Sequence, residues 1–243
     1  MRIGLTRTEN PVKQQYYVDW LKGTEDIDIV ELSWANDNLD ELKSCDGLVL
    51  SGGIDIHPDI YGNKHTEYPG MPAKFDEKRD KFEIEAYKIV QDNQLPVLAI
   101  CRGMQLINVL YHGTLVQNLQ EDEDGEGHKG NPDKLHKVNI YYDTILHNWT
   151  DRSSDQVNSA HHQAIDKLGE GLMINSKTAD GVIEGIEFED KTDKSFLLGI
   201  QWHPERMFRF ELQNSPFSLN IRNHFIEEIK KSTESKELQD ENY

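Results

Sequence analysis

An unbroken apolar run at residues 95–100 (LPVLAI) constrains the fold of this chain more than any other feature. A strand that is apolar on both faces must be covered on both faces, which is typical of a central strand in a parallel sheet flanked by helices. Residues 104–110 follow closely and are apolar on several sides, as expected of a helix packed against that sheet. The run therefore predicts an α/β fold built around one buried strand.

The residues before this run alternate between strand and helix patterns. Residues 3–5 alternate as a short strand, and Asn10-Pro11 is typical of a helix N-cap followed by proline in the first turn. Residues 27–32 and 47–50 predict two further strands with a short helix between them. Successive strands separated by helices imply a parallel sheet.

The second half of the chain contains more strand patterns. Residues 54–78 lack periodicity and are expected to form a long surface loop, suited to a lid over a site. A polar, glycine-rich segment follows at 121–133, and a helix pattern at 217–229 closes the fold. We expect residues 1–230 to form one domain and residues 231–243 to be a polar tail with no reason to fold. Strands that continue the same sheet are expected at 138–142, 157–159, 172–175, 182–188 and 196–202.

Composition and charge narrow the class of protein. The chain has 243 residues, 36% of them hydrophobic, which suffices for one large domain with a buried core. Its 26 Lys and Arg against 44 Asp and Glu give a net charge of -18, which repels phosphate groups. Nucleic acid and anionic membranes are therefore not expected as partners. No apolar run approaches the roughly 18 residues of a membrane span.

The two cysteines, Cys45 and Cys101, cannot form a disulfide framework, and a reducing cytoplasm is the expected location. We expect no signal peptide, because the first six residues already form a strand pattern. A free cysteine is commonly a small buried apolar residue, and this is our interpretation of Cys45.

Cys101 has a different setting. The stretch Ala99-Ile100-Cys101-Arg102-Gly103 places it between the buried strand and the next helix, with small residues two positions before and after it. Such small residues allow strand and helix to approach closely, so that a tight turn can expose a nucleophile. A helix N-terminus behind the sulfur would also favour the thiolate. The pattern predicts a nucleophile elbow.

A second strand end carries His203 and Glu205, in the stretch GIQWHPE at 199–205. A cysteine nucleophile needs an imidazole that takes and returns a proton, and the imidazole needs a partner that fixes its tautomer. His203 and Glu205 have these roles if their strand ends beside Cys101, at the carboxyl edge where ligands bind in open α/β sheets. Alone, His-Pro-Glu is also compatible with a surface turn.

A third strand end carries Ser51-Gly52-Gly53. Glycines let backbone N–H groups approach a substrate oxygen closely, and the N–H groups of Gly53 and Arg102 are candidates for an oxyanion hole. An ordinary tight turn is the alternative interpretation for a Gly-Gly pair taken by itself.

These three features, in the order Gly-Gly, Cys-Arg-Gly, His-Pro-Glu, resemble the class I glutamine amidotransferase family. The closer resemblance is to its γ-glutamyl-γ-aminobutyrate hydrolase branch, grouped with the C26 peptidases, and it extends over about residues 1–230. The resemblance implies a flavodoxin-like three-layer sandwich with a central, mostly parallel sheet. It rests further on residues 52–58 (GGIDIHP), 61–62 (YG), 79–80 (RD), 95–105 (LPVLAICRGMQ), 158–164 (NSAHHQA) and 180–184 (DGVIE).

The resemblance also implies roles for individual residues. Cys101 is implied as nucleophile, His203 as general base and then acid, and Glu205 as the residue that orients His203. Gln105 and Gly52 are implied to help hold the glutamyl group. The segment with His161 and His162 lies where related enzymes present backbone groups to the substrate. The chain departs from the family in having Ala99 where glycine is commoner, and Tyr111-His112-Gly113 where Gly-Gly is usual.

Ten histidines raise the question of a metal site. The candidates are His128, His136, His161 and His162, but neither HExxH nor paired Cys/His spacing occurs, and His162 belongs to the family segment. We therefore expect neither a metal nor an organic cofactor.

The expected activity is hydrolysis of a γ-glutamyl amide through a glutamyl thioester, which releases glutamate and an amine. The expected ligand is a small γ-glutamyl amide or glutamine, and a homo-oligomer is compatible with the sequence. One alternative is a glutaminase subunit that delivers ammonia to a synthetase on another chain. Another is a binding protein that keeps the fold without catalysis.

Overall fold

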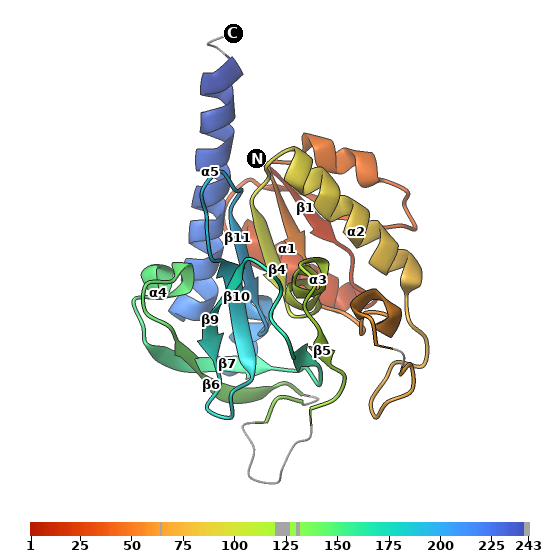
Figure 1. Ribbon diagram of the computed structural model, residues 1–243. Coiled ribbons are helices and arrows are strands. Elements are labelled where there is room, and N and C mark those ends of the chain that lie inside the picture. Colours follow the sequence, from red (N-terminus) through yellow and green to blue (C-terminus); the bar gives the residue numbers. More distant parts are fainter. Residues whose placement is uncertain (64, 120–126, 130–131, 241–243) are drawn as a thin grey trace.

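A nine-stranded mixed sheet runs through the centre of the protein (Figure 1). The structure is a computed structural model that describes residues 1–63, 65–119, 127–129 and 132–240, without the side chains of 239 and 240. The strand order is β2-β1-β3-β4-β11-β10-β9-β6-β7. The strands are β1 (Arg2–Thr6), β2 (Asp28–Leu32), β3 (Gly47–Leu50), β4 (Val97–Ile100), β6 (Lys134–Ile140), β7 (Ser154–Ser159), β9 (Leu172–Lys177), β10 (Ile183–Phe188) and β11 (Leu197–Ile200).

The sheet is mostly parallel, as expected. Strands β2, β1, β3, β4 and β11 pair in parallel, whereas β10, β9, β6 and β7 add on through antiparallel pairings. Because two antiparallel steps restore the direction, only β10 and β6 of this sheet run against the others. The strand-rich second half of the chain therefore continues the sheet of the first half, which confirms that prediction.

Helices cover both faces of the sheet and complete a three-layer sandwich (Figure 1). Along β4, Val97 and Ala99 join the apolar cluster that includes α2 and α3, while Leu98 and Ile100 join the cluster that includes α1 and α5. All four side chains are buried, as the apolar run predicts. The helices are α1 (Pro11–Lys22), α2 (Glu77–Asp92), α3 (Arg102–Leu110), α4 (Ile145–Thr150) and α5 (Ile221–Asp240).

The first helix begins where the sequence predicts. The side chain of Asn10 accepts hydrogen bonds from the N–H groups of Val12 and Lys13 at 2.9 and 3.2 Å, which satisfies donors that the first turn leaves free. The helix ends at Gly23, whose φ of 51° suits glycine. These local signals set where α1 begins and where it ends.

Three features differ from the sequence-based expectations. The sequence does not predict the shortest elements, because segments of two to six residues show no clear periodicity. These elements are α4 and a two-stranded sheet of β5 (Leu115–Val116) and β8 (Ala164–Ile165). The long loop at 54–78 contains a 3₁₀ turn, Pro58–Tyr61. Residues 231–240, expected to be an unfolded tail, continue α5, since their Lys and Glu residues favour helix and extend a helix that is already packed. The predicted segment 121–133 and residues 241–243 lie largely or wholly outside the described residues.

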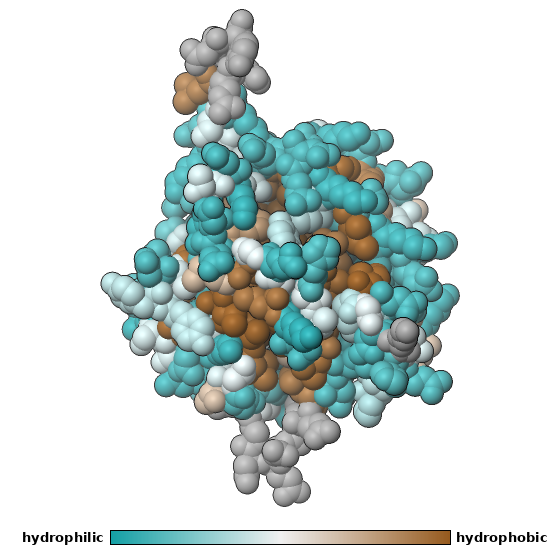
Figure 2. Space-filling model, in the orientation of Figure 1, coloured by the Kyte–Doolittle hydropathy of each residue, from teal (hydrophilic) through white to brown (hydrophobic). Residues whose placement is uncertain are grey.

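The surface agrees with the charge of the chain. On the face drawn in Figure 2, hydrophilic side chains cover most of the molecule, and apolar side chains gather in smaller central areas. None of the helices described is both long and apolar enough to cross a membrane.

The topology brings three separate parts of the chain to one edge. Strands β3, β4 and β11 are neighbours that run in parallel, so their carboxyl ends lie side by side. Gly52 and Gly53 follow β3, Cys101 follows β4, and His203 follows β11. This edge is where ligands bind in open α/β sheets.

Candidate active site

Cys101 occupies a sharp turn between β4 and α3. Its φ and ψ are 53° and -107°, outside the regions that L-residues normally adopt. Such a backbone costs about 1–3 kcal/mol and is typical of functional sites. A Cβ on Gly103 would overlap the carbonyl oxygen of Leu50, which explains the small residue two positions after the cysteine. The turn therefore has the strand–turn–helix geometry that the sequence predicts.

The imidazole of His203 is held from several sides. Its Nδ1 lies 2.8 Å from Oε1 of Glu205 and 3.3 Å from the hydroxyl oxygen of Tyr17. The backbone N–H of His203 donates to Oδ1 of Asn158 at 3.2 Å. Because these contacts occupy Nδ1, Nε2 is the ring nitrogen left for proton transfer with a nucleophile.

Charges around His203 favour its protonated form. Burial and the Arg206 guanidinium lower the pKa of the imidazole, but the Glu205 carboxylate and the Cys101 sulfur outweigh them and raise it to about 9. An imidazolium beside the sulfur stabilises a thiolate in turn. The imidazole is therefore suited to carry a proton near neutral pH and to give it to a leaving group.

A cavity of about 190 Å³ opens onto these groups. Cys101, His203 and Glu205 all line it, and only 7% of the surface of Cys101 is exposed. The structure thus brings three residues from two strand ends into one small pocket. The lining also includes Gly52, Gly53, Glu9, Lys13, Tyr17 and Ala160.

The glycine pair lies against the imidazole. A Cβ on Gly52 would be 2.6 Å from Cε1 of His203 and 3.5 Å from Cβ of Cys101, so only glycine fits there. The N–H of Gly52 donates to the Tyr17 hydroxyl at 2.9 Å. Since that donor is already used, the next N–H of the loop, that of Gly53, is the candidate for a substrate oxygen.

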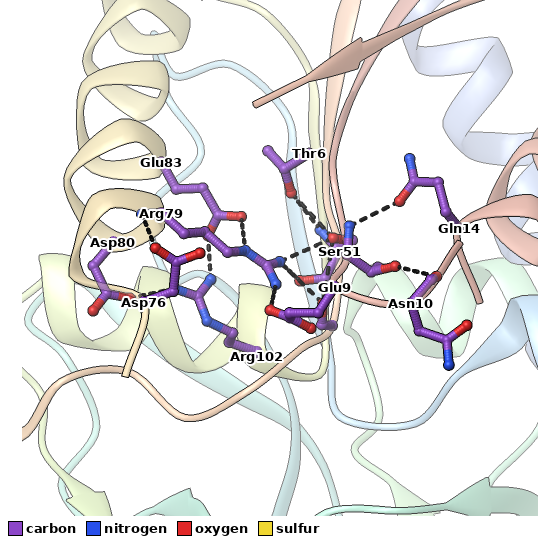
Figure 3. Close-up of polar contacts among 12 residues, drawn as sticks. Thr6, Glu9, Asn10, Gln14, Ser51, Asp76, Arg79, Asp80, Glu83 and Arg102 are labelled. Carbon is purple, nitrogen blue, oxygen red and sulfur yellow. Dashed lines mark hydrogen bonds and ion pairs between the residues drawn. The ribbon is translucent and has the colours of Figure 1, made fainter. Parts of the chain in front are cut away.

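Arg79 fixes the glycine loop from behind (Figure 3). Its Nη2 donates to the carbonyl oxygen of Gly52 at 3.0 Å and to Oγ of Ser51 at 3.1 Å. Its Nε donates to Glu83 at 2.8 Å, and its Nη1 donates to Glu9 at 2.5 Å. One buried guanidinium therefore connects α2 to the loop after β3.

Arg102 joins the same network from the first turn of α3. Its guanidinium contacts the carboxylates of Asp80 and Glu83, so Glu83 lies between two arginines (Figure 3). Burial opposes ionisation of Glu83, but Arg102 and Arg79 outweigh it and hold the pKa of this carboxyl below its usual range. The network thus ties together the two backbone segments that carry the candidate oxyanion donors.

The remaining predicted residues surround the pocket without turning their side chains into it. Nε2 of Gln105 donates to the carbonyl oxygen of Gln163 at 3.2 Å and to Oε1 of Gln201 at 3.1 Å. Nε2 of His161 lies 3.3 Å from Glu184, and His162 pairs with Asp55 at 2.9 Å. Of the segment 160–162, Ala160 is the residue that lines the described cavity.

Several residues at the site were missed by sequence reasoning. Tyr17 is buried, and its hydroxyl contacts both Gly52 and His203, which no sequence motif indicates. Glu9, just before α1, and Lys13, in its first turn, line the cavity and carry no sequence signal of their own. Asn158 lies within the family segment NSAHHQA, so that motif was the one signal that pointed to it.

Comparisons with known proteins agree with this architecture. The family model described as Peptidase C26 matches residues 12–205. A relative from Rickettsia prowazekii that is named glutamine amidotransferase-like is 32% identical over 233 residues, covering 78% of this chain and 80% of the relative. The γ-glutamyl-γ-aminobutyrate hydrolase PuuD of Escherichia coli is 27% identical over 174 residues, covering 68% of this chain and 65% of that protein.

A solved structure shows the same fold. A chain of Thermoplasma acidophilum that is named as part of a GMP synthase has a TM-score of 0.68 at 18% identity, with 98% of both chains covered. This likeness concerns the fold alone, whereas the family model and the Rickettsia relative show to which family the chain belongs. The chain belongs to the peptidase C26 family of glutamine amidotransferase-like proteins, and it is a hydrolase that acts on C–N bonds.

Proposed function

We propose that this protein hydrolyses γ-glutamyl amides with Cys101 as nucleophile, His203 as acid and base, and Glu205 as the residue that orients His203. The observation that carries the proposal is the shared pocket. Cys101 and His203 both line it, and Glu205 lies 2.8 Å from the ring nitrogen that points away from the reaction. This is the arrangement that a thiol hydrolase requires.

The proposed reaction has two halves. The Cys101 thiolate attacks the γ-carbonyl carbon, the C–N bond breaks, and the departing amine takes a proton from His203. The resulting glutamyl thioester is attacked by water, which gives a proton to His203 as the C–S bond breaks. Glutamate is released and the thiolate is restored, so one water is consumed for each amide cleaved.

Both tetrahedral intermediates carry a negative oxygen. The N–H groups of Gly53 and Arg102 are the proposed donors to it, because they belong to the two segments that the Arg79 and Arg102 network holds together. Preorganised donors of this kind are each worth roughly 10²–10³ in rate.

The charges of the pocket suit the amino-acid end of a glutamyl group. Glu9 and Lys13 have opposite charge and both line the cavity. A γ-glutamyl substrate presents an α-ammonium and an α-carboxylate, so a carboxylate and an ammonium on the wall can pair with both. The small volume of the cavity favours a small ligand over a polypeptide.

A second candidate is ammonia transfer to a synthetase on another chain. It is favoured by the relative named glutamine amidotransferase-like. Both functions use the same thioester and differ in the amide that is cleaved and in the need for a partner. Since both need a free thiol, we propose a reducing compartment such as the cytoplasm; both cysteines are free in the structure.

The decisive experiment measures glutamate release by the isolated protein from γ-glutamyl-γ-aminobutyrate and from glutamine. Turnover of the γ-glutamyl amine without a partner supports the hydrolase. Glutamine turnover that appears only after a synthetase is added supports the second candidate. Cys101→Ala should abolish turnover of either substrate, while Cys45→Ala, the matched cysteine variant, should keep it.

Trapping with a glutamine-like electrophile tests the nucleophile directly. Mass spectrometry should find the adduct on Cys101. An adduct on Cys45 alone, or full activity in Cys101→Ala, would contradict the assignment. Burial raises the pKa of Cys45 to about 11, so this thiol forms little of the reactive thiolate near neutral pH.

A further inference from the structure

Three histidines converge on one buried carboxylate away from the pocket lining. Nδ1 of His128 lies 3.5 Å from Oε1 of Glu184, Nε2 of His161 lies 3.3 Å from the same oxygen, and Nε2 of His136 lies 3.4 Å from Oε2. Glu184 has no exposed surface, and the three histidines are each at most 4% exposed. We call these four residues the histidine cluster.

The histidine cluster concentrates unsatisfied polar atoms. Among the described residues, twelve buried side-chain nitrogen and oxygen atoms lack a hydrogen-bond partner, and six of them belong to these four residues. Both oxygens of Glu184 are among the six, as are the nitrogens of His128, His136 and His161 that face it. Buried groups left without hydrogen bonds are costly, so this arrangement calls for a partner beyond the ion pairs that the side chains make with one another.

The spacing of the facing atoms fits a metal ion. Zinc binds histidine nitrogen and carboxylate oxygen at about 2.0–2.2 Å, which places neighbouring tetrahedral ligand atoms about 3.3–3.6 Å apart. The separations from the Glu184 oxygens, 3.3 to 3.5 Å, fall in this range. The ligand atoms of His128, His136 and Glu184 also lie within 4.8 Å of one another, so these three residues are close enough together to be candidate ligands of one ion.

The outer contacts of two histidines match those of metal ligands. Nε2 of His128 lies 2.9 Å from Oδ2 of Asp180, and Nδ1 of His161 lies 2.8 Å from the carbonyl oxygen of Gln163. Histidines that bind metals usually donate their second ring N–H to a carboxylate or a carbonyl, which fixes the ring and its tautomer. Each of these two rings thus directs its unpartnered nitrogen toward Glu184.

We propose that the histidine cluster binds one zinc ion through Nδ1 of His128, Nε2 of His136, Nε2 of His161 and the carboxylate of Glu184. Three imidazoles and a carboxylate suit zinc and related first-row ions, whereas calcium and magnesium prefer an all-oxygen set. Four protein ligands would leave no open position, as in structural sites. The proposed ion differs from the sequence-based expectation of no metal. The sequence does not indicate the site because the four ligands come from separate segments that no spacing motif connects.

The proposed ion would position a wall of the active site. His161 directly follows Ala160, which lines the cavity, and lies three residues after Asn158, which accepts the backbone N–H of His203. The backbone N–H of His161 also donates to the carbonyl oxygen of His128 at 3.0 Å. The ligands would therefore act as positioning residues, and the ion would hold the segment 158–161 in place beside the pocket.

The test begins with the metal content of the protein itself. Protein purified without a histidine tag is stripped with a chelator, dialysed against zinc, freed of excess ion and measured by mass spectrometry of metals. We expect about one zinc per chain. Cobalt in place of zinc should give the intense visible absorption of a tetrahedral site. Wild-type protein that retains no zinc, or that shows only a weak octahedral cobalt spectrum, would overturn the proposal.

Variants locate the ion. His136→Ala and Glu184→Gln should lose the bound zinc, while His65→Ala, an exposed histidine outside the cluster, should keep it. Asp180→Asn changes a partly exposed outer contact, so it is expected to fold, and it should weaken zinc binding about 10–100-fold. Zinc retained at full affinity by Asp180→Asn and by either ligand variant would show that the ion binds elsewhere.

The metal readouts separate this proposal from the proposed function. Zinc bound by a protein that hydrolyses no γ-glutamyl amide would leave the site standing and remove the function. Hydrolysis by a protein that binds no zinc would support the function and remove the zinc site.

Discussion

The hydroxyl oxygen of Tyr17 lies 3.3 Å from Nδ1 of His203, although the two residues are 186 positions apart. The same oxygen accepts the N–H of Gly52 at 2.9 Å. Burial raises the pKa of this phenol well above its usual value, so the hydroxyl keeps its proton. Tyr17 therefore joins α1 to two strand ends and supports the imidazole at Nδ1, the nitrogen that also contacts Glu205.

Tyr17→Phe tests this contact. The change leaves the buried N–H of Gly52 without its acceptor, which should lower the free energy of unfolding by about 1–3 kcal/mol. We expect kcat/KM to fall about tenfold, because the loop and the ring lose a shared support. Tyr16→Phe is the control, since Tyr16 packs edge-on against Phe208 with ring centres 5.2 Å apart. Equal effects of the two substitutions would refute a specific role for Tyr17.

The protonation of His203 can be measured directly. Nuclear magnetic resonance of the labelled imidazole should give a pKa of about 9. The charged form is lost as the pH rises through this value, and with it the acid that protonates the departing amine. Activity should therefore fall on the alkaline side near pH 9.

Glu205→Gln provides the matched test of the cause. The Glu205 carboxylate raises the pKa of His203, so its removal should lower that pKa and shift the alkaline loss of activity toward neutral pH. An unchanged pKa in Glu205→Gln would contradict the proposed role of this carboxylate.

Gly52→Ala tests the close approach of the loop to the ring. The added methyl group would lie 2.6 Å from Cε1 of His203, so the imidazole must move. A displacement of about 1 Å at a reacting group costs roughly 10²-fold in rate, and we expect a loss of at least that size in kcat/KM. Gly171→Ala is the comparison: its φ is 72° but no atom lies within 4 Å of the added carbon, so it should cost stability and spare activity. Near-normal kcat/KM in Gly52→Ala would show that the ring is not confined in this way.

Local signals made the framework predictable. The apolar run at 95–100 and the cap at Asn10 each act over a few residues. The strand and the helix that they predict, β4 and α1, lie where the sequence places them. The neighbourhood of Cys101 and His203 followed from parallel strands that share a carboxyl edge, together with the family resemblance. The partners of Tyr17 and Glu184 could not be predicted, because they depend on the packing of segments that no motif connects.

Glu83→Gln tests the buried network behind the oxyanion donors. The substitution removes a charge that lies between the guanidinium groups of Arg79 and Arg102, and breaking such a buried pair costs about 3–5 kcal/mol. Urea denaturation should show this loss. Glu85→Gln on the same helix removes an exposed pair with Lys88 and should cost less than about 1 kcal/mol. A difference near zero between the two variants would mean that the network does not stabilise the fold.

Lys13→Met tests recognition of the amino-acid end of the substrate. Lys13 lines the cavity, and its ammonium is the proposed partner of the substrate α-carboxylate. Loss of this charge should raise KM for glutamine or a γ-glutamyl amine about tenfold while kcat stays constant, because the contact exists equally in the ground and transition states. Lys22→Met, at the other end of the same helix, should leave both constants unchanged.

A substrate analogue makes the test of Lys13 specific. 4-Aminobutanamide is glutamine without its α-carboxylate, so wild type and Lys13→Met should bind it with equal strength. If Lys13→Met weakens the analogue as much as it weakens glutamine, the lysine acts on the shape or the general charge of the pocket and not on the carboxylate. Equal KM values for glutamine in both proteins would instead place the α-carboxylate elsewhere, with the Arg206 guanidinium on the same cavity wall as the next residue to substitute.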